Sequence, residues 1–62
     1  MKKLICDKIR ILRITKGYSQ AYIASELKVS QGYYSKIENG CKPISDYYLK
    51  KLSKILEVNL LD

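Results

Sequence analysis

The amino-acid sequence predicts an all-α fold, a compact four- to five-helix bundle that forms one domain over residues 1–62. Apolar residues recur at the three- and four-residue spacing of amphipathic helices, and the alternation typical of a β-strand never persists. Glycine or proline at positions 17, 40 and 43 separates these periodic stretches. A chain this short buries only a thin core, which favours a packed helical unit over an enzyme with a deep cavity.

The first predicted helix covers residues 4–16. Ile5, Ile9 and Leu12 are spaced so that they fall on one face of this helix, which is therefore expected to face the core. Gly17 follows directly, and glycine is the residue that most readily adopts the left-handed conformation at a helix end.

Three further helices are predicted, over residues 20–27, 31–39 and 46–56. A serine stands directly before each, and its side-chain oxygen can accept a free backbone N–H of the first turn. The first two of these helices are separated by only three residues, which is the length of a helix-turn-helix unit. A final helical turn, capped by Asn59, is expected within residues 57–62. The three serines are Ser19, Ser30 and Ser45.

The helix predicted over residues 31–39 has two different faces. On a helical wheel, Tyr34 and Ile37 point to one side, which is expected to face the core, and Tyr33 lies at the edge. The opposite arc has no acidic residue and one cation. This surface suits the DNA major groove, because glutamine pairs with adenine, serine with several base edges, and lysine with guanine or phosphate. The arc consists of Gln31, Gly32, Ser35, Lys36 and Asn39.

Gly32 is unusual in a helix, because glycine costs about 1 kcal/mol there relative to alanine. A residue without a side chain lets the backbone approach a base or a sugar closely, and we interpret Gly32 in this way. Tyr33, at the rim, would then reach a phosphate with its hydroxyl or a thymine methyl with its ring. The alternative is that Gly32 is a tolerated imperfection on a solvated helix face.

The chain is basic, with twelve Lys and Arg against six Asp and Glu, and a net charge of +6. This excess favours a polyanionic partner, with nucleic acid ahead of an acidic membrane, and an ordinary basic surface is the alternative. No membrane partner is expected, because the apolar stripe of residues 46–56 is needed for the core. The apolar run of residues 4–6 is too short for a signal peptide or a membrane span, so we expect a cytoplasmic protein.

Catalytic and metal-binding chemistry is not expected. The chain has no histidine, no paired carboxylates and no glycine-rich phosphate loop, so the groups for acid–base and nucleophilic catalysis are lacking. Cys6 and Cys41 form no CxxC pair and have no adjacent base, and we interpret them as free thiols without an assigned role. We therefore expect no enzyme activity, no cofactor, no metal and no small-molecule ligand.

The stretch YSQAYIASELKVSQGYYSKIENGCKPIS, residues 18–45, resembles the Cro and phage-repressor type of helix-turn-helix regulators, the XRE-like family. The resemblance extends over residues 5–58, and it implies a lambda-repressor-like fold and a sequence-specific transcriptional regulator that binds double-stranded DNA. The positions that match the family pattern are Leu12, Arg13, Lys16, Gly17, Tyr18, Ser19, Gln20, Ile23, Ala24, Leu27, Val29, Ser30, Ser35, Ile37, Glu38, Asn39, Gly40 and Pro43.

The resemblance also implies roles for individual residues. Arg13 and Glu38 would form a partly buried ion pair with a structural role. The helix over residues 31–39 would enter the major groove. Contacts with bases or the groove would come from Gln31, Gly32, Tyr33, Ser35 and Lys36. Contacts with phosphates would come from Ser19, Gln20, Ser30, Asn39 and Lys42.

Two positions depart from the family pattern. Lys28 occupies a turn position that is often glycine, and a left-handed conformation costs a residue with a side chain roughly 1–2 kcal/mol. The turn at Lys28 is therefore expected to be strained or differently shaped. Gly32 is the second departure, because glycine is unusual within a recognition helix.

The expected function is repression, because blocking a promoter requires no further protein surface. A homodimer would place two recognition helices about 34 Å apart and so read a palindromic operator. Val58, Leu60 and Leu61 are candidates for the dimer contact, with simple closure of the core as the alternative. The alternative function is that of an antitoxin or phage-type switch whose main partner is another protein.

Overall fold

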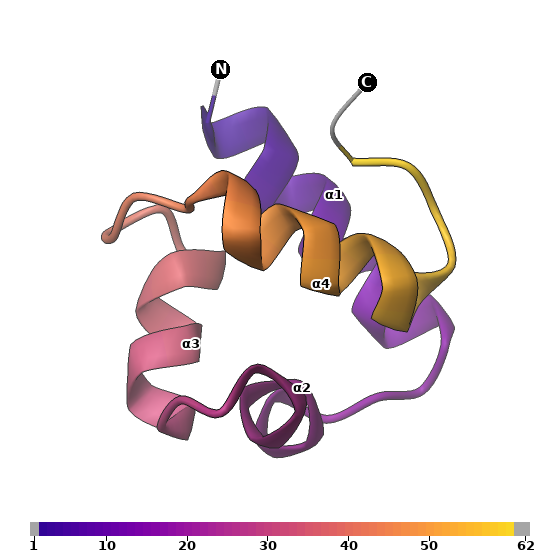
Figure 1. The fold of residues 1–62 in the computed structure, drawn as a ribbon, viewed down its shortest axis with the longest axis horizontal. Helices are drawn as coiled ribbons and strands as arrows, with labels where there is room; N and C mark the ends of the chain where they lie inside the picture. Colours follow the sequence, from indigo (N-terminus) through magenta and orange to yellow (C-terminus); the bar gives the residue numbers. More distant parts are fainter. Residues whose placement is uncertain (1, 61–62) are drawn as a thin grey trace.

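A computed structural model describes residues 2–60, and this part of the chain contains four α-helices and no strand (Figure 1). The helices are α1 (Lys2–Thr15), α2 (Gln20–Leu27), α3 (Gln31–Glu38) and α4 (Asp46–Leu56). Both α1 and α2 pack against α3 and against α4. The all-α bundle that the sequence predicts is confirmed, with four helices in the described residues.

The helix boundaries agree closely with the sequence prediction. α2 and α4 have the predicted limits. α1 begins two residues and ends one residue earlier than expected, and α3 ends one residue earlier. The final helical turn predicted within residues 57–62 is wrong for the described residues. Glu57 adopts a left-handed conformation with a φ of 58°, and residues 58–60 continue without helical structure.

Each of the three predicted serine caps is present. The serines have extended backbone conformations, with φ between −71° and −84°, which leave the side-chain oxygen facing the first turn. An N-cap of this kind stabilises a helix by about 1 kcal/mol. The backbone N–H groups donate from Tyr22 to Ser19, from Tyr33 to Ser30, and from Tyr48 to Ser45, with N–Oγ distances of 3.0, 3.1 and 3.3 Å.

An apolar core lies between the four helices. Tyr34 is its largest fully buried side chain, and Ile37 is also fully buried, so the inward face predicted for α3 is confirmed. Ala24 of α2 is also buried in this core. The core consists of Ile9, Ile23, Ala24, Leu27, Tyr34, Leu49, Leu52, Leu56 and Leu60.

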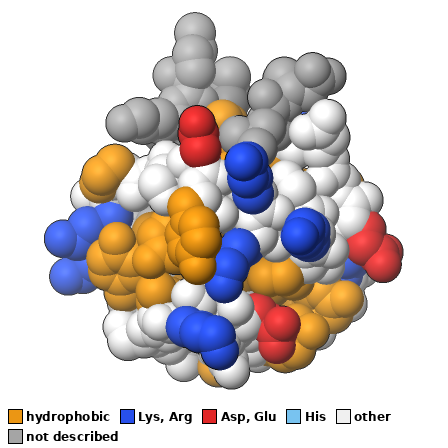
Figure 2. Space-filling model, viewed as in Figure 1, with side chains coloured by type: hydrophobic (Ala, Val, Ile, Leu, Met, Phe, Trp, Pro, Cys, Tyr) orange, Lys and Arg blue, Asp and Glu red, His pale blue; other side chains and the backbone are white. Residues whose placement is uncertain are grey.

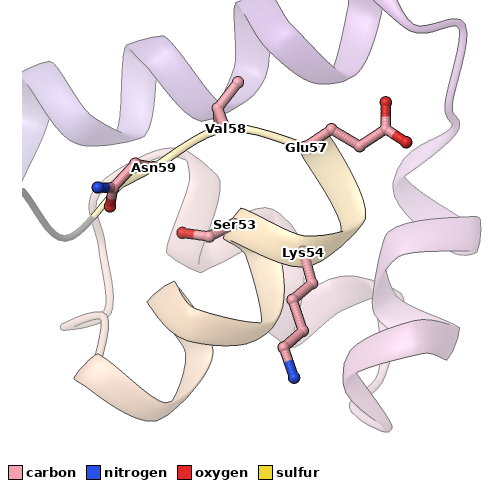
Figure 3. Close-up of a pocket in the computed structure, with 5 residues that line it drawn as sticks. All are labelled: Ser53, Lys54, Glu57, Val58 and Asn59. Carbon is pink, nitrogen blue, oxygen red and sulfur yellow. The ribbon is translucent and has the colours of Figure 1, made fainter.

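The segment after α4 folds back along the bundle. The N–H of Leu60 donates to Ser53 Oγ at 3.1 Å, and the leucine side chain enters the core with 9% of its surface exposed. Val58 is half-buried, and its side chain points towards α1 (Figure 3). Val58 and Leu60 were candidates for the dimer contact, with closure of the core as the alternative. In the single chain both residues pack as core closure describes. Leu61 lies outside the described residues.

The helices of the described chain are too short and too polar to cross a membrane.

Candidate nucleic-acid interface

A tight turn joins α2 to α3. Lys28 has φ 61° and ψ 41°, so it adopts the left-handed conformation although it is not a glycine. The turn is closed by backbone hydrogen bonds, from Lys28 N to Ser25 O at 3.1 Å and from Val29 N to Ala24 O at 3.0 Å. The Lys28 side chain is exposed, so the strain at this position is not offset by burial.

A buried carboxylate ties this unit to α1. Glu38, the last residue of α3, is 1% exposed. Its two oxygens accept hydrogen bonds from Arg13 Nε at 2.8 Å and Arg13 Nη2 at 3.1 Å. They also accept from Gln20 Nε2 at 3.0 Å and from the Tyr34 hydroxyl at 2.6 Å. Arg13 Nη1 further donates to the carbonyl oxygen of Tyr18 at 2.9 Å. Side chains from α1, α2 and α3 therefore converge on one carboxylate.

The charges of this cluster are stabilised by its hydrogen bonds. Burial alone would raise the pKa of the Glu38 carboxyl, but hydrogen bonds from Arg13, Tyr34 and Gln20 outweigh burial and lower the pKa below its ordinary value. The hydrogen bond with Glu38 raises the pKa of Arg13, and burial followed by the bond to Glu38 raises the pKa of Tyr34. At neutral pH the cluster is thus a charged arginine and carboxylate with a neutral tyrosine, which suits a structural role.

Arg13, Gln20, Tyr34 and Glu38 form what we call the Glu38 cluster. The sequence did not predict that Gln20 and Tyr34 belong to it. The helical pattern predicts that Tyr34 lies in the core, without indicating a partner for its hydroxyl, and the family resemblance implies that Gln20 contacts phosphate. Tyr34 and Glu38 are four residues apart in α3, and residues at this spacing share a helix face, so the signal was present. The Gln20 contact depends on how α2 crosses α3, which no local pattern reveals.

The outward face of α3 brings the predicted base-contacting residues together. Gln31, Gly32 and Lys36 are exposed, while Tyr33 and Ser35 are half-buried at the rim. The acidic residue of α3, Glu38, points inward, so the exposed face of this helix is free of negative charge. It offers an amide, hydroxyls and an ammonium group, which are hydrogen-bonding groups that read base edges.

Gly32 is not required by the fold of the free chain. Its φ lies outside the left-handed region, and a Cβ added at this position would meet no atom within 4 Å. Alanine would therefore fit in the unbound protein and would favour the helix. A physical reason for glycine at this position is that another molecule can come close to the helix backbone where no side chain stands.

The residues predicted to contact phosphate lie at the ends of α2 and α3. Ser19 and Gln20 stand at the start of α2, Ser30 stands at the start of α3, and Asn39 and Lys42 follow α3. All except the half-buried Gln20 are exposed. Each helix start presents backbone N–H groups and the positive end of the helix dipole, which attract anions. The two serines accept N–H bonds with their oxygens, and their hydroxyl hydrogens can still donate.

The segment after α3 has a defined conformation. Gly40 adopts a φ of 81°, which ends the helix in the way predicted for glycine. The N–H groups of Cys41 and Lys42 both donate to the carbonyl oxygen of Lys36, at 2.8 and 3.3 Å. The backbone therefore holds Lys42 close to the C-terminal end of α3.

The two cysteines differ in their surroundings. In residues 2–60, histidine, cysteine, aspartate and glutamate nowhere gather in a group of three that could hold a metal ion. Cys6 is buried, and its Sγ–H donates to the carbonyl oxygen of Ile37 at 3.1 Å, while Cys41 is exposed. Burial, followed by the negative charges of Asp7 and Glu38, raises the pKa of the Cys6 thiol. This thiol is therefore a poor nucleophile.

Comparison with known proteins agrees with this geometry. Residues 9–62 match the helix-turn-helix family. The HTH-type transcriptional regulator SlrR of Bacillus subtilis (strain 168) is 47% identical over 55 residues, which cover 87% of this chain and 36% of SlrR. The HTH-type transcriptional regulator RamB of Mycobacterium tuberculosis is 29% identical over 58 residues, which cover 94% of this chain and 12% of RamB. No solved structure matches the chain.

The chain spans about a third of the length of SlrR and a smaller part of RamB. Its match to the family, in contrast, extends over most of its own length and includes the turn, α3 and the segment after it. The chain therefore belongs to the XRE-type helix-turn-helix family of DNA-binding transcriptional regulators.

Proposed function

We propose that this chain is a sequence-specific repressor that binds a palindromic operator as a homodimer, with α3 in the major groove. The observation that carries the proposal is the exposed face of α3, which presents hydrogen-bonding groups and a cation without any carboxylate. Family membership supports DNA binding, while the repressor role, the palindrome and the dimer go beyond it.

Base recognition is assigned to the first two turns of α3. Gln31 offers a side-chain amide that pairs in two places with adenine, and Ser35, one turn further on, reaches a neighbouring base edge. Gly32 lets the helix backbone come close to the DNA between these two contacts. Tyr33 and Lys36, three residues apart, lie together along one edge of this face and would contact the sugar–phosphate backbone or a base at the rim of the groove.

Phosphate contacts are assigned to both ends of the helix-turn-helix unit. Ser19 and Gln20 would hold one phosphate at the N-terminus of α2, with the Gln20 side chain fixed in place by its bond to Glu38. Asn39 and Lys42 would hold another after α3. Such contacts set the position of α3 on the duplex but carry no sequence information by themselves.

The dimer is proposed from the geometry of DNA and not from an observed interface. Two copies of α3 about 34 Å apart would meet successive major grooves on one side of the duplex. Val58 is the half-exposed member of the dimer candidates, Leu60 belongs to the core, and Leu61 lies outside the described residues. Occupancy of a promoter by such a dimer would repress transcription without any contact to the polymerase.

Selection from a pool of randomised duplexes tests this function. We expect an enriched palindrome whose half-site centres are one helical turn apart, with binding that weakens as salt is raised because counterions are released from the DNA. Weak binding that depends on salt and enriches no sequence would contradict the proposal.

A further inference from the structure

A basic stripe covers the outward face of α4. Tyr47, Lys50, Lys51 and Lys54 are spaced at three- and four-residue intervals, so they share one face of this helix. The buried leucines of α4 lie on the opposite face, so the stripe points away from the core. In Figure 2, which views the molecule as Figure 1 does, Lys and Arg side chains gather over α4.

The stripe borders two adjoining hollows. One, of about 230 Å³, is lined by the four stripe residues alone. The other, of about 260 Å³, is lined by Lys51, Lys54, Ile55 and Glu26 of α2. The two hollows share Lys51 and Lys54, and together they reach from the outward face of α4 to Glu26 of α2. We call this surface the α4 groove.

The described residues do not neutralise the lysines of the α4 groove. None of the three forms an ion pair with another described residue, and the acidic residue of the lining is Glu26. Lys51 Nζ instead lies 5.1 Å from the centre of the Tyr47 ring, a cation–π contact that leaves its charge in place. Figure 3 shows the Lys54 side chain pointing away from Glu57, whose carboxylate pairs with Lys16 at 3.0 Å. The groove therefore carries an excess of positive charge.

The α4 groove is separate from the proposed DNA-binding face. α3 and α4 each pack against α1 and α2, and within residues 2–60 their backbones make no close contact with each other, although Tyr34 and the buried leucines of α4 share one core. None of the residues proposed to contact DNA belongs to α4, so that assignment leaves the outward face of α4 to another partner.

The lining also differs from that of a phosphate track. The exposed Tyr47 ring, 60% of whose residue surface is accessible, and the half-buried Ile55 offer apolar contact. The Glu26 carboxylate accepts backbone N–H groups but repels phosphate. We propose that the α4 groove binds an acidic segment of a partner protein, in which carboxylates meet the lysines and apolar side chains meet Tyr47 and Ile55.

Titration of the ¹⁵N-labelled chain with a short peptide of alternating glutamate and leucine tests this proposal by NMR. A glutamine–leucine peptide of the same length is the uncharged control. We expect the acidic peptide to shift the amide signals of residues 47–55 and of Glu26, with smaller changes in α3, and we expect the control peptide to shift neither set. Absence of binding, or shifts centred on α3, would overturn the proposal.

Two single-charge variants sharpen the test. Lys54→Gln removes one lysine of the groove, and Lys8→Gln removes an exposed lysine of α1 outside it. Since one exposed ion pair changes affinity by a few-fold, we expect Lys54→Gln to weaken peptide binding roughly threefold and Lys8→Gln to leave it unchanged. An equal loss in both variants would show attraction to net charge alone and would overturn the proposal.

Duplex binding by the same variants separates this inference from the proposed DNA-binding function. We expect Lys54→Gln to bind the selected duplex as tightly as the unmodified chain does. A loss of duplex affinity without a loss of peptide affinity would assign the groove to DNA phosphates and overturn the peptide assignment. Failure of the peptide titration alone would leave DNA recognition by α3 intact.

Discussion

The hydroxyl of Tyr34 donates a 2.6 Å hydrogen bond to the carboxylate of Glu38, one turn further along α3. Tyr34 is also the largest fully buried side chain of the core, and Glu38 is bonded to Arg13 and Gln20. Apolar packing and charged hydrogen bonds therefore act together to hold α3 at one point. This arrangement fixes the direction in which α3 presents its outward face.

Replacing Tyr34 by phenylalanine should reveal the strength of that link. Tyr34→Phe keeps the ring in the core but removes a hydrogen-bond donor from a buried carboxylate, which we expect to lower the free energy of unfolding by about 1–3 kcal/mol. Urea denaturation measures this change. Tyr33→Phe is the matched control at the half-buried rim of α3, where surface substitutions change stability by at most about 0.5 kcal/mol. Equal stabilities of the two variants would refute a structural role for the hydroxyl.

The stability of the chain should depend on the ionisation of Glu38. Its pKa is lower in the folded chain than the ordinary value near 4.5. A carboxyl with a depressed pKa contributes stability that is present above the ordinary value and is lost as the pH falls through the folded-state value. We therefore expect the free energy of unfolding to decrease as the pH is lowered below about 4.5, as measured by urea denaturation over a pH series.

Two glutamate variants test the assignment of this acid sensitivity. Glu26→Gln alters an exposed carboxyl, so the free energy of unfolding should still decrease to the same extent as the pH is lowered. Glu38→Gln should remove much of it, and should cost about 3–5 kcal/mol at neutral pH because Arg13 is left without its charged partner. If the acid-induced decrease were abolished by Glu26→Gln instead, its assignment to Glu38 would be wrong.

Gly32 should show opposite effects on folding and on DNA binding. Because a Cβ there meets open space, Gly32→Ala is expected to raise the free energy of unfolding by up to about 1 kcal/mol, as helix propensity requires. The same methyl group would obstruct close approach and weaken duplex binding. Thermal unfolding and fluorescence anisotropy measure the two effects. Gly17→Ala, at a φ of 77°, is the control and should destabilise the chain. Unchanged duplex affinity of Gly32→Ala would favour a tolerated imperfection.

The turn between α2 and α3 should be strained at Lys28. Lys28→Gly removes the side chain from a left-handed residue and is expected to raise the free energy of unfolding by about 1 kcal/mol. Lys28→Ala removes the same charge but keeps Cβ, so it should not give this gain. Comparison of the two thermal melting temperatures isolates the backbone effect, and equal melting temperatures would argue against strain.

Local sequence patterns were sufficient to predict most of the fold. The serines before α2, α3 and α4 and the spacing of apolar residues define helix limits through interactions within one or two turns. The direction of α3 was predictable for the same reason, since Tyr34 and Ile37 are the apolar residues on one side of it. The outward face followed from that direction without any knowledge of the tertiary structure.

Features that depend on distant segments were not predictable in this way. Gln20 was not predicted to bond to Glu38, because the contact requires α2 and α3 to cross at a particular place. The tail was predicted to be helical, but Ser53 Oγ accepts the N–H of Leu60, and the chain turns back at Glu57. No residue between positions 57 and 60 signals that bond by its type alone.

The proposed function depends on recognition of bases by the outward face of α3. The most direct measurement is the affinity of the chain for the selected duplex and for duplexes with single base changes, compared with that of Gln31→Ala. We expect the unmodified chain to lose affinity at several positions, by about 1–3 kcal/mol for each mismatch. Gln31→Ala should lose the preference at one of these positions and keep the others. If all base changes affected both proteins equally, recognition of bases by α3 would be contradicted.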